Sequence, residues 1–539
     1  MFGFREMRYS RNFRETVQDV FGGMDRRAAA SDGAICVCRN MCAGKYPALT
    51  TRGFRGDYAY VPNQNGFFAR DCIVWVDGKM LVVDGAEVAQ LTAGPKLIAG
   101  IQKKICIWPD KVIYDRETGE LTQMEAEWEG SAAFSGGTYA GEPALANTIT
   151  VAGNLTGLFR AGDGLAVHTG EKTYGAFVVQ EVGYLTDAKK TELRFLEETW
   201  RELLPEGEGK PDTVTMQVKL QRRAPELDGV FEHHNRLWGW SGFTICCCKL
   251  GDPTNWESFN GDSTDSWELV TGTPGAITGG ISYGGRPVFF KENRIIRVYG
   301  DYPMQYSTSE TESLGVETGS GKSLAVAGDT LYYKSHQGIM AFAGGYPYCI
   351  SDEFGDERYT NAVAGSDGVR YYVSMDDAAG SPVVFVYDTR YQTWYEEDSA
   401  RYIGFGWYGD LYAMGQFGEV QAIGELRREK PTEEGLATHV EFADMTDGTA
   451  RKKGVGRLVL RMEIDEGTDI DIYIRYDSQG DWVKVKHLKG ENLKGQTEVI
   501  IPVRRCDHYR IKLEGHGLRG TGWTLYSLTR ERYIGSNRK

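Results

Sequence analysis

Residues 330–342 read TLYYKSHQGIMAF. Two short segments, Thr330–Ser335 and Ile339–Phe342, lie on either side of a turn that contains Gly338. Aromatic and β-branched residues favour strands, and a glycine-containing turn between two such segments is typical of a β-hairpin. This stretch therefore predicts two antiparallel strands.

Similar hairpins recur along the chain at a regular interval. The anchor residues Leu331, Tyr371 and Leu411 are separated by 40 residues each time, and a four-stranded propeller blade takes about 40–50 residues. One blade cannot bury both of its faces, so blades stack around an axis. Further hairpins are predicted at residues 71–83, 235–249 and 287–299. The pattern predicts an irregular β-propeller.

The composition favours the same fold class. The 539 residues include 68 glycines but only 16 prolines, without a collagen period. Glycine inside a helix costs about 1 kcal/mol relative to alanine, so a helical bundle is disfavoured. Aromatic residues at 12% and hydrophobic residues at 41% are enough to form a core, which argues against disorder.

The predicted fold is all-β: an irregular β-propeller with a small inserted β domain, an extended N-terminal arm and a C-terminal β-sandwich. The inserted domain is predicted where strand-like segments break the rhythm of the blades, and the sandwich where six segments alternate apolar and polar residues. The predicted boundaries are residues 1–55 for the arm, 56–118 and 226–428 for the blades, 119–225 for the inserted domain and 429–539 for the sandwich.

The net charge of −14 disfavours a DNA-coating protein, because a negative surface repels phosphate. The longest apolar runs are strand-sized, so no membrane-spanning helix is predicted. Residues 1–8 lack the apolar core of a signal peptide. We therefore expect the ten cysteines to be mostly reduced thiols.

The first 20 residues carry arginines at intervals of three: Arg5, Arg8, Arg11 and Arg14. They either decorate a solvated arm or dock on a neighbouring molecule. Residues 21–52 show no sustained period, as expected of a segment that needs partners to become ordered.

No cofactor and no metal are predicted. Gly319–Ser323 resembles part of a phosphate-binding loop, but its glycine spacing is wrong and the residues after it predict strands instead of a helix. Cys36 and Cys38 are too close for the usual zinc knuckle. Cys246–Cys248 fall in a predicted strand, where neighbouring side chains point to opposite faces and cannot converge on one ion.

No catalytic residue is predicted either. A glycosidase needs two carboxyl groups about 5–10 Å apart, and in a propeller such a pair would come from different blades. Glu125, Glu127 and Glu129 alternate along one segment and do not identify a pair.

Tryptophans remain as possible ligand contacts. Trp238, Trp240, Trp394 and Trp407 in the blades are expected to pack between blades, with sugar stacking as the alternative. In the predicted sandwich, Trp482 and Trp523 are the candidate ligand-contact residues.

The N-terminal motif Phe21-Gly-Gly-Met-Asp-Arg26 is followed by Asp32-Gly33, Arg39-Asn40, Pro47-Ala-Leu49 and Arg52. This order resembles the N-terminal pattern of phage tail hub, nozzle and packaged-DNA stabilisation proteins.

Two later segments are similar to the same family. One is His234-Asn-Arg-Leu-Trp238 with Leu250-Gly-Asp-Pro-Thr-Asn-Trp256, and the other is the blade segment Gly315–Ile339, which contains Gly328-Asp-Thr-Leu-Tyr-Tyr333. The resemblance covers the arm and much of residues 226–345, whereas the predicted insertion and sandwich match it only loosely.

The resemblance implies a non-enzymatic structural protein of the virion, made in the host cytoplasm, that forms a homo-oligomeric ring of six copies in the phage neck or tail. Its partners would be the portal or adaptor and other tail proteins, and double-stranded DNA would pass through without specific binding. The assembly contacts would come from the arm: Arg5, Arg8, Arg11, Arg14 and Phe21.

Two alternatives stay open. The sandwich favours a tail-tip or baseplate protein that binds a receptor or carbohydrate. A propeller hydrolase would bring a pair of carboxylates together in a central pocket.

Overall fold

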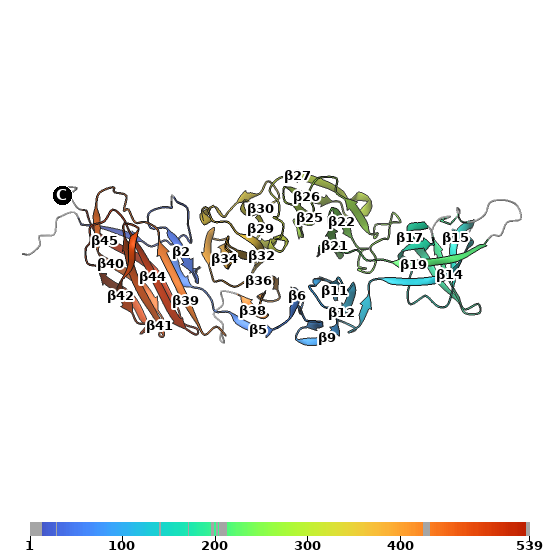
Figure 1. The fold of residues 1–539 in the computed structure, drawn as a ribbon, viewed down its shortest axis with the longest axis horizontal. Coiled ribbons are helices and arrows are strands. Elements are labelled where there is room, and N and C mark those ends of the chain that lie inside the picture. The colour runs from blue at the N-terminus through green and yellow to red at the C-terminus, as the bar shows by residue number, and fades with distance from the viewer. Residues whose placement is uncertain are drawn as a thin grey trace, which may run out of the picture. The chain divides into compact units, whose positions relative to one another are not determined.

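A computed structural model describes residues 13–28, 30–139, 142–170, 172–195, 199–200, 203, 213–423 and 432–534. The fold is all-β, and its four-stranded antiparallel sheets are those of a β-propeller with additional β-sheets (Figure 1). The chain forms two compact units: the barrel unit, residues 65–318, and the sandwich unit, residues 1–64 and 319–539.

The barrel unit contains four antiparallel sheets of four strands. Apolar clusters fill the space between successive sheets, with Val74 and Ile107 in the first cluster and Trp238 and Phe289 in the last. The strands are β6 (Gln64–Ala69), β7 (Ile73–Asp77), β8 (Met80–Val83), β9 (Ala86–Gln90), β10 (Leu97–Ile101), β11 (Lys104–Trp108), β12 (Val112–Asp115), β13 (Leu121–Gln123), β20 (Gly229–His233), β21 (Arg236–Ser241), β22 (Thr244–Cys247), β23 (Trp267–Val270), β24 (Gly279–Tyr283), β25 (Arg286–Lys291), β26 (Arg294–Tyr299) and β27 (Ser307–Glu312).

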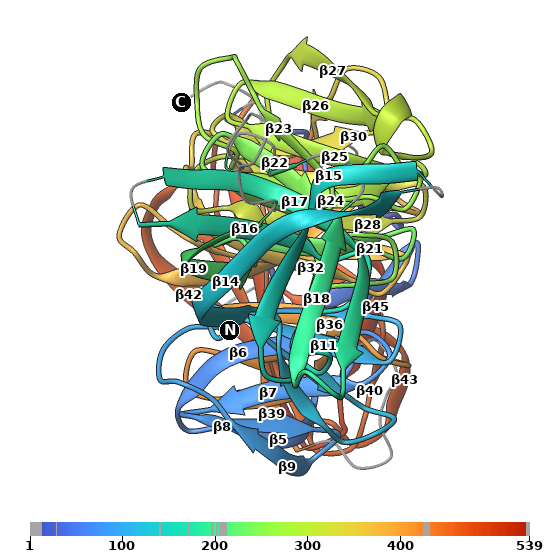
Figure 2. The same ribbon diagram turned by 90° about the vertical axis from the view of Figure 1, so that its right-hand side faces the viewer.

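Between β13 and β20 the chain forms a closed barrel in the order β14-β15-β18-β17-β16-β19 (Figure 2). Its core is packed around Trp200, whose ring contacts Phe134, Tyr174, Phe177 and Phe195 edge to face. The strands are β14 (Ala126–Tyr139), β15 (Glu142–Ala152), β16 (Gly164–Thr169), β17 (Lys172–Leu185), β18 (Lys190–Phe195) and β19 (Thr213–Arg222).

The sandwich unit holds three more propeller-type sheets. The predicted 40-residue spacing places Leu331, Tyr371 and Leu411 at equivalent positions, in the second strand of each sheet. The last sheet takes its outer strand, β5 (Gly56–Tyr60), from early in the chain. The other strands are β28 (Ala325–Ala327), β29 (Thr330–Ser335), β30 (Gly338–Phe342), β31 (Tyr348–Cys349), β32 (Thr360–Ser366), β33 (Arg370–Asp376), β34 (Pro382–Asp388), β35 (Thr393–Glu396), β36 (Tyr402–Trp407), β37 (Leu411–Gly415) and β38 (Glu419–Ile423).

The sandwich itself contains strands from both ends of the sequence. One layer is β3-β4-β45-β40-β43 with β1 added on β45, and the other is β2-β39-β44-β41-β42, which continues through β2 into β32–β35. In Figure 1, blue β2 lies beside orange β39. The strands are β1 (Phe13–Gln18), β2 (Ile35–Arg39), β3 (Met41–Lys45), β4 (Ala48–Thr51), β39 (Gly435–Phe442), β40 (Lys453–Ile464), β41 (Thr468–Tyr476), β42 (Gln479–Leu488), β43 (Leu493–Ile500), β44 (Tyr509–Leu518) and β45 (Trp523–Ile534).

This arrangement corrects the predicted separate arm and sandwich over the described residues. β1 pairs with β45, from Phe13 opposite Tyr533 to Gln18 opposite Leu528, and β2 pairs with β39. The apolar residues of these strands are buried by segments from the far end of the sequence, which no local pattern reveals. None of the described residues forms a helix long and apolar enough to cross a lipid bilayer.

Candidate functional site

The segment with the first family-like motif is fixed to the end of β35 by two arginines. Arg26 donates to Glu357 at 2.6 Å and to the Tyr359 hydroxyl at 3.1 Å, and it also pairs with Glu396. Arg39 on β2 binds the same Glu396 through Nε at 2.7 Å. Burial lowers the pKa of Arg26, but Glu396, Tyr359 and Glu357 together raise it above its usual value. The guanidinium is therefore charged in this partly buried position.

A second ionic group lies just beyond, where two buried arginines meet three carboxylates. Arg55 donates to Glu397 and to Asp398, both at 2.5 Å. Arg52 binds both oxygens of Glu433, at 2.8 and 3.0 Å, in a two-pronged contact. The backbone N–H of Arg55 also donates to Glu433 at 2.7 Å.

The pKa values of this group follow from its pairing. Burial raises the pKa of Asp398, but Arg55 and Arg52 lower it by more, so the pKa lies below its ordinary value. The pKa of Glu433 is lowered in the same way, against burial, by Arg52 and Arg55. Each charge offsets the desolvation of its partner, and removal of one partner leaves the other buried and unpaired. We call the two groups the ionic junction: Arg26, Arg39, Arg52, Arg55, Glu396, Glu397, Asp398 and Glu433.

The glycine pair of the motif has one position that only glycine fits. Gly23 has φ +79°, and a Cβ there would lie 2.8 Å from Thr393 Cβ and from the carbonyl oxygen of Trp394. The next residue, Met24, donates its N–H to that carbonyl at 2.7 Å. Gly22 has open space around it. The close approach at Gly23 lets the segment pass directly over β35.

Asn40 links the same segment to the sandwich. It has the left-handed φ of +56°, which asparagine tolerates better than most residues. Its Nδ2 donates to the carbonyl of Ala437 at 2.8 Å, and its Oδ1 accepts from Arg52 Nε at 2.8 Å. The motif residues therefore hold the N-terminal segment, the sandwich and β35 together.

The LGDPTNW segment has a comparable role in the barrel unit. Arg160 binds Asp252 at 3.0 Å and the Thr254 hydroxyl at 2.6 Å. Asn255 donates to the carbonyl of Gly162 at 2.5 Å and accepts from the N–H of Gly164 at 3.3 Å. The loop that follows β22 thus forms a socket for the start of barrel strand β16.

Two further features tighten this socket. A Cβ on Gly164 would lie 2.0 Å from the carbonyl oxygen of Glu257, so the two backbones are in direct contact. Arg222, the last residue of β19, forms a buried ion pair at 2.7 Å with Asp163, the residue just before β16. The barrel is therefore attached by several polar contacts and not by a simple linker.

The third motif segment binds neighbouring strands through its hydroxyls. Gly321–Ser323 forms one 3₁₀ turn. The Ser320 hydroxyl accepts from the N–H of Ala362 at 3.1 Å, and the Ser323 hydroxyl accepts from the N–H of Lys334 at 2.9 Å. Strands follow the turn, and a phosphate loop would need a helix there.

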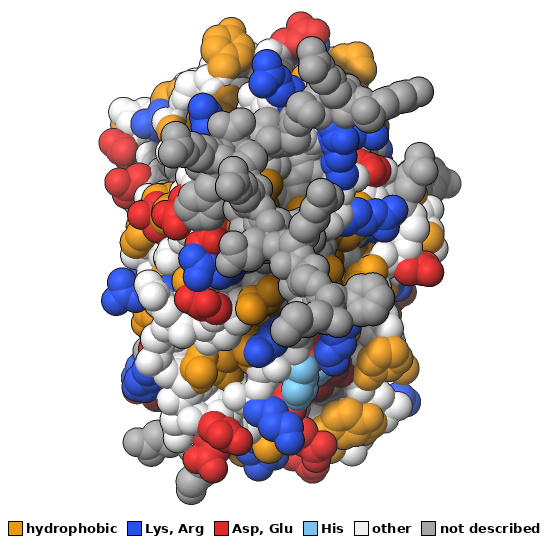
Figure 3. All heavy atoms as spheres, turned by 90° about the vertical axis from the view of Figure 1, so that its left-hand side faces the viewer, with side chains coloured by type: hydrophobic (Ala, Val, Ile, Leu, Met, Phe, Trp, Pro, Cys, Tyr) orange, Lys and Arg blue, Asp and Glu red, His pale blue; other side chains and the backbone are white. Residues whose placement is uncertain are grey.

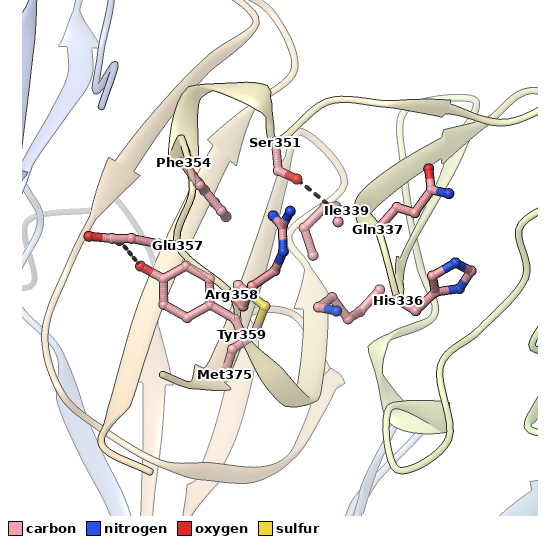
Figure 4. Close-up of a pocket in the computed structure, with 11 residues that line it drawn as sticks. His336, Gln337, Ile339, Ser351, Phe354, Glu357, Arg358, Tyr359 and Met375 are labelled. Carbon is pink, nitrogen blue, oxygen red and sulfur yellow. Dashed lines mark hydrogen bonds between the residues drawn. The ribbon is translucent and has the colours of Figure 1, made fainter. Parts of the chain in front are cut away.

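A hollow lies beside the ionic junction, between β30, β33 and the turn after β31 (Figure 4). On its wall the Tyr359 hydroxyl donates to Glu357, and the Ser351 hydroxyl accepts from the N–H of Ile339 at 2.9 Å. Its free volume of about 20 Å³ is close to what one water molecule needs. It is too small for a sugar or nucleotide.

The predicted assembly residues fall in different places. Arg5, Arg8 and Arg11 lie outside the described residues. Arg14 is exposed on β1, opposite Arg532. Phe21 is only 1% exposed and packs in the chain's own core near Phe442. Phe21 is therefore corrected from an intermolecular contact to a core residue, because the sandwich supplies the apolar surface that we expected from a neighbour.

The two sandwich tryptophans also differ. Trp523 is 2% exposed and donates to the Thr438 hydroxyl at 2.8 Å, so it is a core residue and not a ligand contact. Trp482 on β42 is half-buried, and Arg475 and Lys512 lie over its ring at 4.7 and 5.0 Å. Basic, acidic and hydrophobic side chains are interspersed on the sandwich face in Figure 3, where undescribed residues do not cover it.

The blade tryptophans mostly follow the packing prediction. Trp238, Trp240 and Trp394 are buried, whereas Trp407 is 47% exposed.

Cys246–Cys248 are buried, and burial raises the pKa of each thiol. Among the described residues no group of His, Cys, Asp or Glu is arranged to hold a metal ion.

Sequence reasoning missed most of the ionic junction. Arg55 and Glu433 carry no motif, and Glu396-Glu397-Asp398 looks like an ordinary solvated run. The one available signal is that this acidic run directly follows the apolar strand residues Trp394-Tyr395, where a core is expected.

No protein-family model matches the chain, and no curated protein sequence matches it. Solved structures with similar strand arrangements include an exo-β-1,3-galactanase from Phanerochaete chrysosporium, with 11% identity, 57% of this chain and 95% of that chain covered, and a TM-score of 0.24. The match with Hsv2 of Kluyvelomyces marxianus has 11% identity, covers 42% of this chain and 82% of that chain, and has a TM-score of 0.25. The match with the N-terminal domain of Nup159 has 8% identity, covers 76% of this chain and 99% of that chain, and has a TM-score of 0.23.

Proposed function

We propose that this chain is a non-enzymatic structural protein of a phage virion, which forms a ring in the neck or tail and serves as genome conduit and assembly platform. The observation that carries the proposal is that the motifs resembling tail hub and nozzle proteins form junctions between domains. Arg26 and Gly23 join the N-terminal segment to β35, Arg52 joins the end of β4 to Glu433 just before β39, and Asn255 joins the barrel to its socket.

The charge of the chain supports the same role. A net charge of −14 repels the phosphates of duplex DNA, so that a genome would slide past the protein without sticking. The partners would be further copies of the chain, the portal or adaptor, and other tail proteins. The protein would be made in the host cytoplasm and act in the virion.

The test is the particle formed by the full chain. Mass photometry of the 60.1-kDa chain should show a closed oligomer of about 360 kDa for six copies. Electron microscopy should show an axial channel of about 20 Å or more, the width of a DNA duplex. A monomer at micromolar concentration, together with failure of antibodies to label virion tails, would contradict the proposal.

A second candidate is a tail-tip protein that binds a receptor or carbohydrate, and the half-buried Trp482 is the observation that favours it. The isolated residues 430–539 are a poor probe, because β2 and β4 complete the sandwich. A glycan array should therefore use the full chain. Binding that is lost in Trp482→Ala and kept in Asp481→Ala, an exposed neighbour, would favour adhesion over the conduit.

A further inference from the structure

A groove opens beside β1 in the sandwich unit. It has about 450 Å³ of free space and is lined by residues between Thr16 and Asp25, by residues 31–35 and by Arg530. Val17 and Val20 line it with 58% and 51% of their surface exposed. Cavities that receive ligands or chain segments have about this size, whereas the hollow beside the ionic junction does not.

The accessible charge in this groove is negative. Asp19 and Asp32 are exposed there, and Asp25 lines it while pairing with Arg27 at 2.8 Å. The basic lining residue Arg530 is only 3% exposed and lies 3.6 Å from Asp447. An occupant should therefore offer cations to the aspartates and apolar side chains to the two valines.

The backbone beside the groove can also take part. Among the described strands, β45 is the one that β1 pairs with, so the other edge of β1 faces away from the sheet. An open strand edge favours the addition of another chain segment through backbone hydrogen bonds.

We propose that the groove beside β1 receives residues 1–12 of a second copy of this chain. Their sequence, MFGFREMRYSRN, contains three arginines and three aromatic residues within 12 positions. The arginines match Asp19 and Asp32, and the aromatic residues match Val17 and Val20. The inference rests on the proposed ring, since it needs a second copy, and it names the surface through which neighbouring copies are joined.

Photo-crosslinking in the full chain tests this directly. A benzoylphenylalanine at Val20 in ¹⁵N-labelled chain is mixed with unlabelled wild-type chain, and crosslinked peptides are identified by mass spectrometry. We expect crosslinks from labelled Val20 peptides to unlabelled residues 1–12. The matched control places the photo-crosslinker at Ile500, which is 78% exposed on β43 of the same sheet and should give no such crosslink.

Charge reversal provides the second arm of the test. Asp19→Lys should reduce the crosslink by about fivefold, as expected for loss of a salt bridge at an exposed site. Among second copies that carry Arg5→Glu, Arg8→Glu or Arg11→Glu singly, one should restore part of it. Asp481→Lys, an exposed acid on β42, should have no effect.

The outcomes separate this inference from the proposed ring. A ring by mass photometry without crosslinks from Val20 to residues 1–12 overturns the groove assignment alone. If the labelled Val20 peptides crosslink only to labelled residues 1–12, the groove takes the N-terminus of its own chain. That result also overturns the groove assignment. A monomer at every concentration overturns both.

Discussion

Arg55→Met tests whether the ionic junction stabilises the contact between the N-terminal segment and β35. Arg55 is 4% exposed and binds Glu397 and Asp398 at 2.5 Å each. Methionine keeps much of the apolar stem and removes the charge. The substitution leaves Glu397, Asp398 and Glu433 with Arg52 as the remaining cation of this group.

The expected cost follows from the burial of these groups. Breaking a buried ion pair by removing one partner costs about 3–5 kcal/mol. The Asp398 and Glu433 side chains are 29% and 19% exposed, so water screens part of the excess charge. We therefore expect a loss near the lower limit, about 3 kcal/mol.

Hydrogen exchange measured by mass spectrometry reports this loss locally, which matters because a chain of two units does not unfold in one step. A loss of about 3 kcal/mol corresponds to about 100-fold faster exchange. We expect this in β35 and at the Glu397 amide, which donates to Val384 at 2.8 Å. Barrel strands β14–β19, in the other unit, should exchange at the wild-type rate.

Two variants decide whether charge is the cause. Glu397→Gln in the Arg55→Met background removes one unpaired carboxylate and should recover a substantial part of the loss. Arg451→Met, at an exposed arginine, should change stability by less than about 0.5 kcal/mol. Two results would refute the reasoning. One is that Arg55→Met changes the exchange rate of β35 by less than about threefold. The other is that Glu397→Gln destabilises the Arg55→Met protein as much as it destabilises the wild type.

Three further predictions concern the same junctions. Gly23→Ala should destabilise the sandwich unit by about 2 kcal/mol or more in thermal unfolding, because it combines positive φ with a backbone clash, whereas Gly22→Ala should be nearly neutral. Gly164→Ala should make the barrel root more sensitive to limited proteolysis because its Cβ would overlap the Glu257 carbonyl, and Gly157→Ala, in open space, should not. Asp398 and Glu433 have lowered pKa values in the fold, so their stabilisation is present at neutral pH and is lost as the pH falls through these lowered values. The unfolding temperature of the sandwich unit should therefore drop in acid, and it should drop less in Arg55→Met; an equal drop in both proteins would contradict the assignment.

The blades were predictable because their information is local. The spacing of Leu331, Tyr371 and Leu411 reports hairpins whose strands pair with neighbours a few residues away. The partners of β1 are about 500 residues distant in sequence, so Phe21 looked like an arm residue although it lies in a core. Within the sandwich, alternation showed that the strands were amphipathic but not which tryptophan faced inward.

The ionic junction was hidden for a different reason. Charged residues such as Glu397 and Asp398 usually mark a solvated surface. Only the chain path that brings Arg52 and Arg55 to them supplies the opposite charges that their burial needs. A functional reading from the sequence could therefore find the motif residues on one side of each contact, but not their partners.

The pairing of β1 with β45 has a consequence for biosynthesis. A ribosome that adds about 5–20 residues per second needs roughly half a minute to nearly two minutes to make the chain between these strands. For most of that interval β1–β4 have been translated, but β40, β44 and β45 do not yet exist. The sandwich can close only after β45 has been translated, so the apolar side chains of residues 21–49 must stay protected from aggregation until then, and a nascent chain stalled before residue 523 should be a substrate for chaperones.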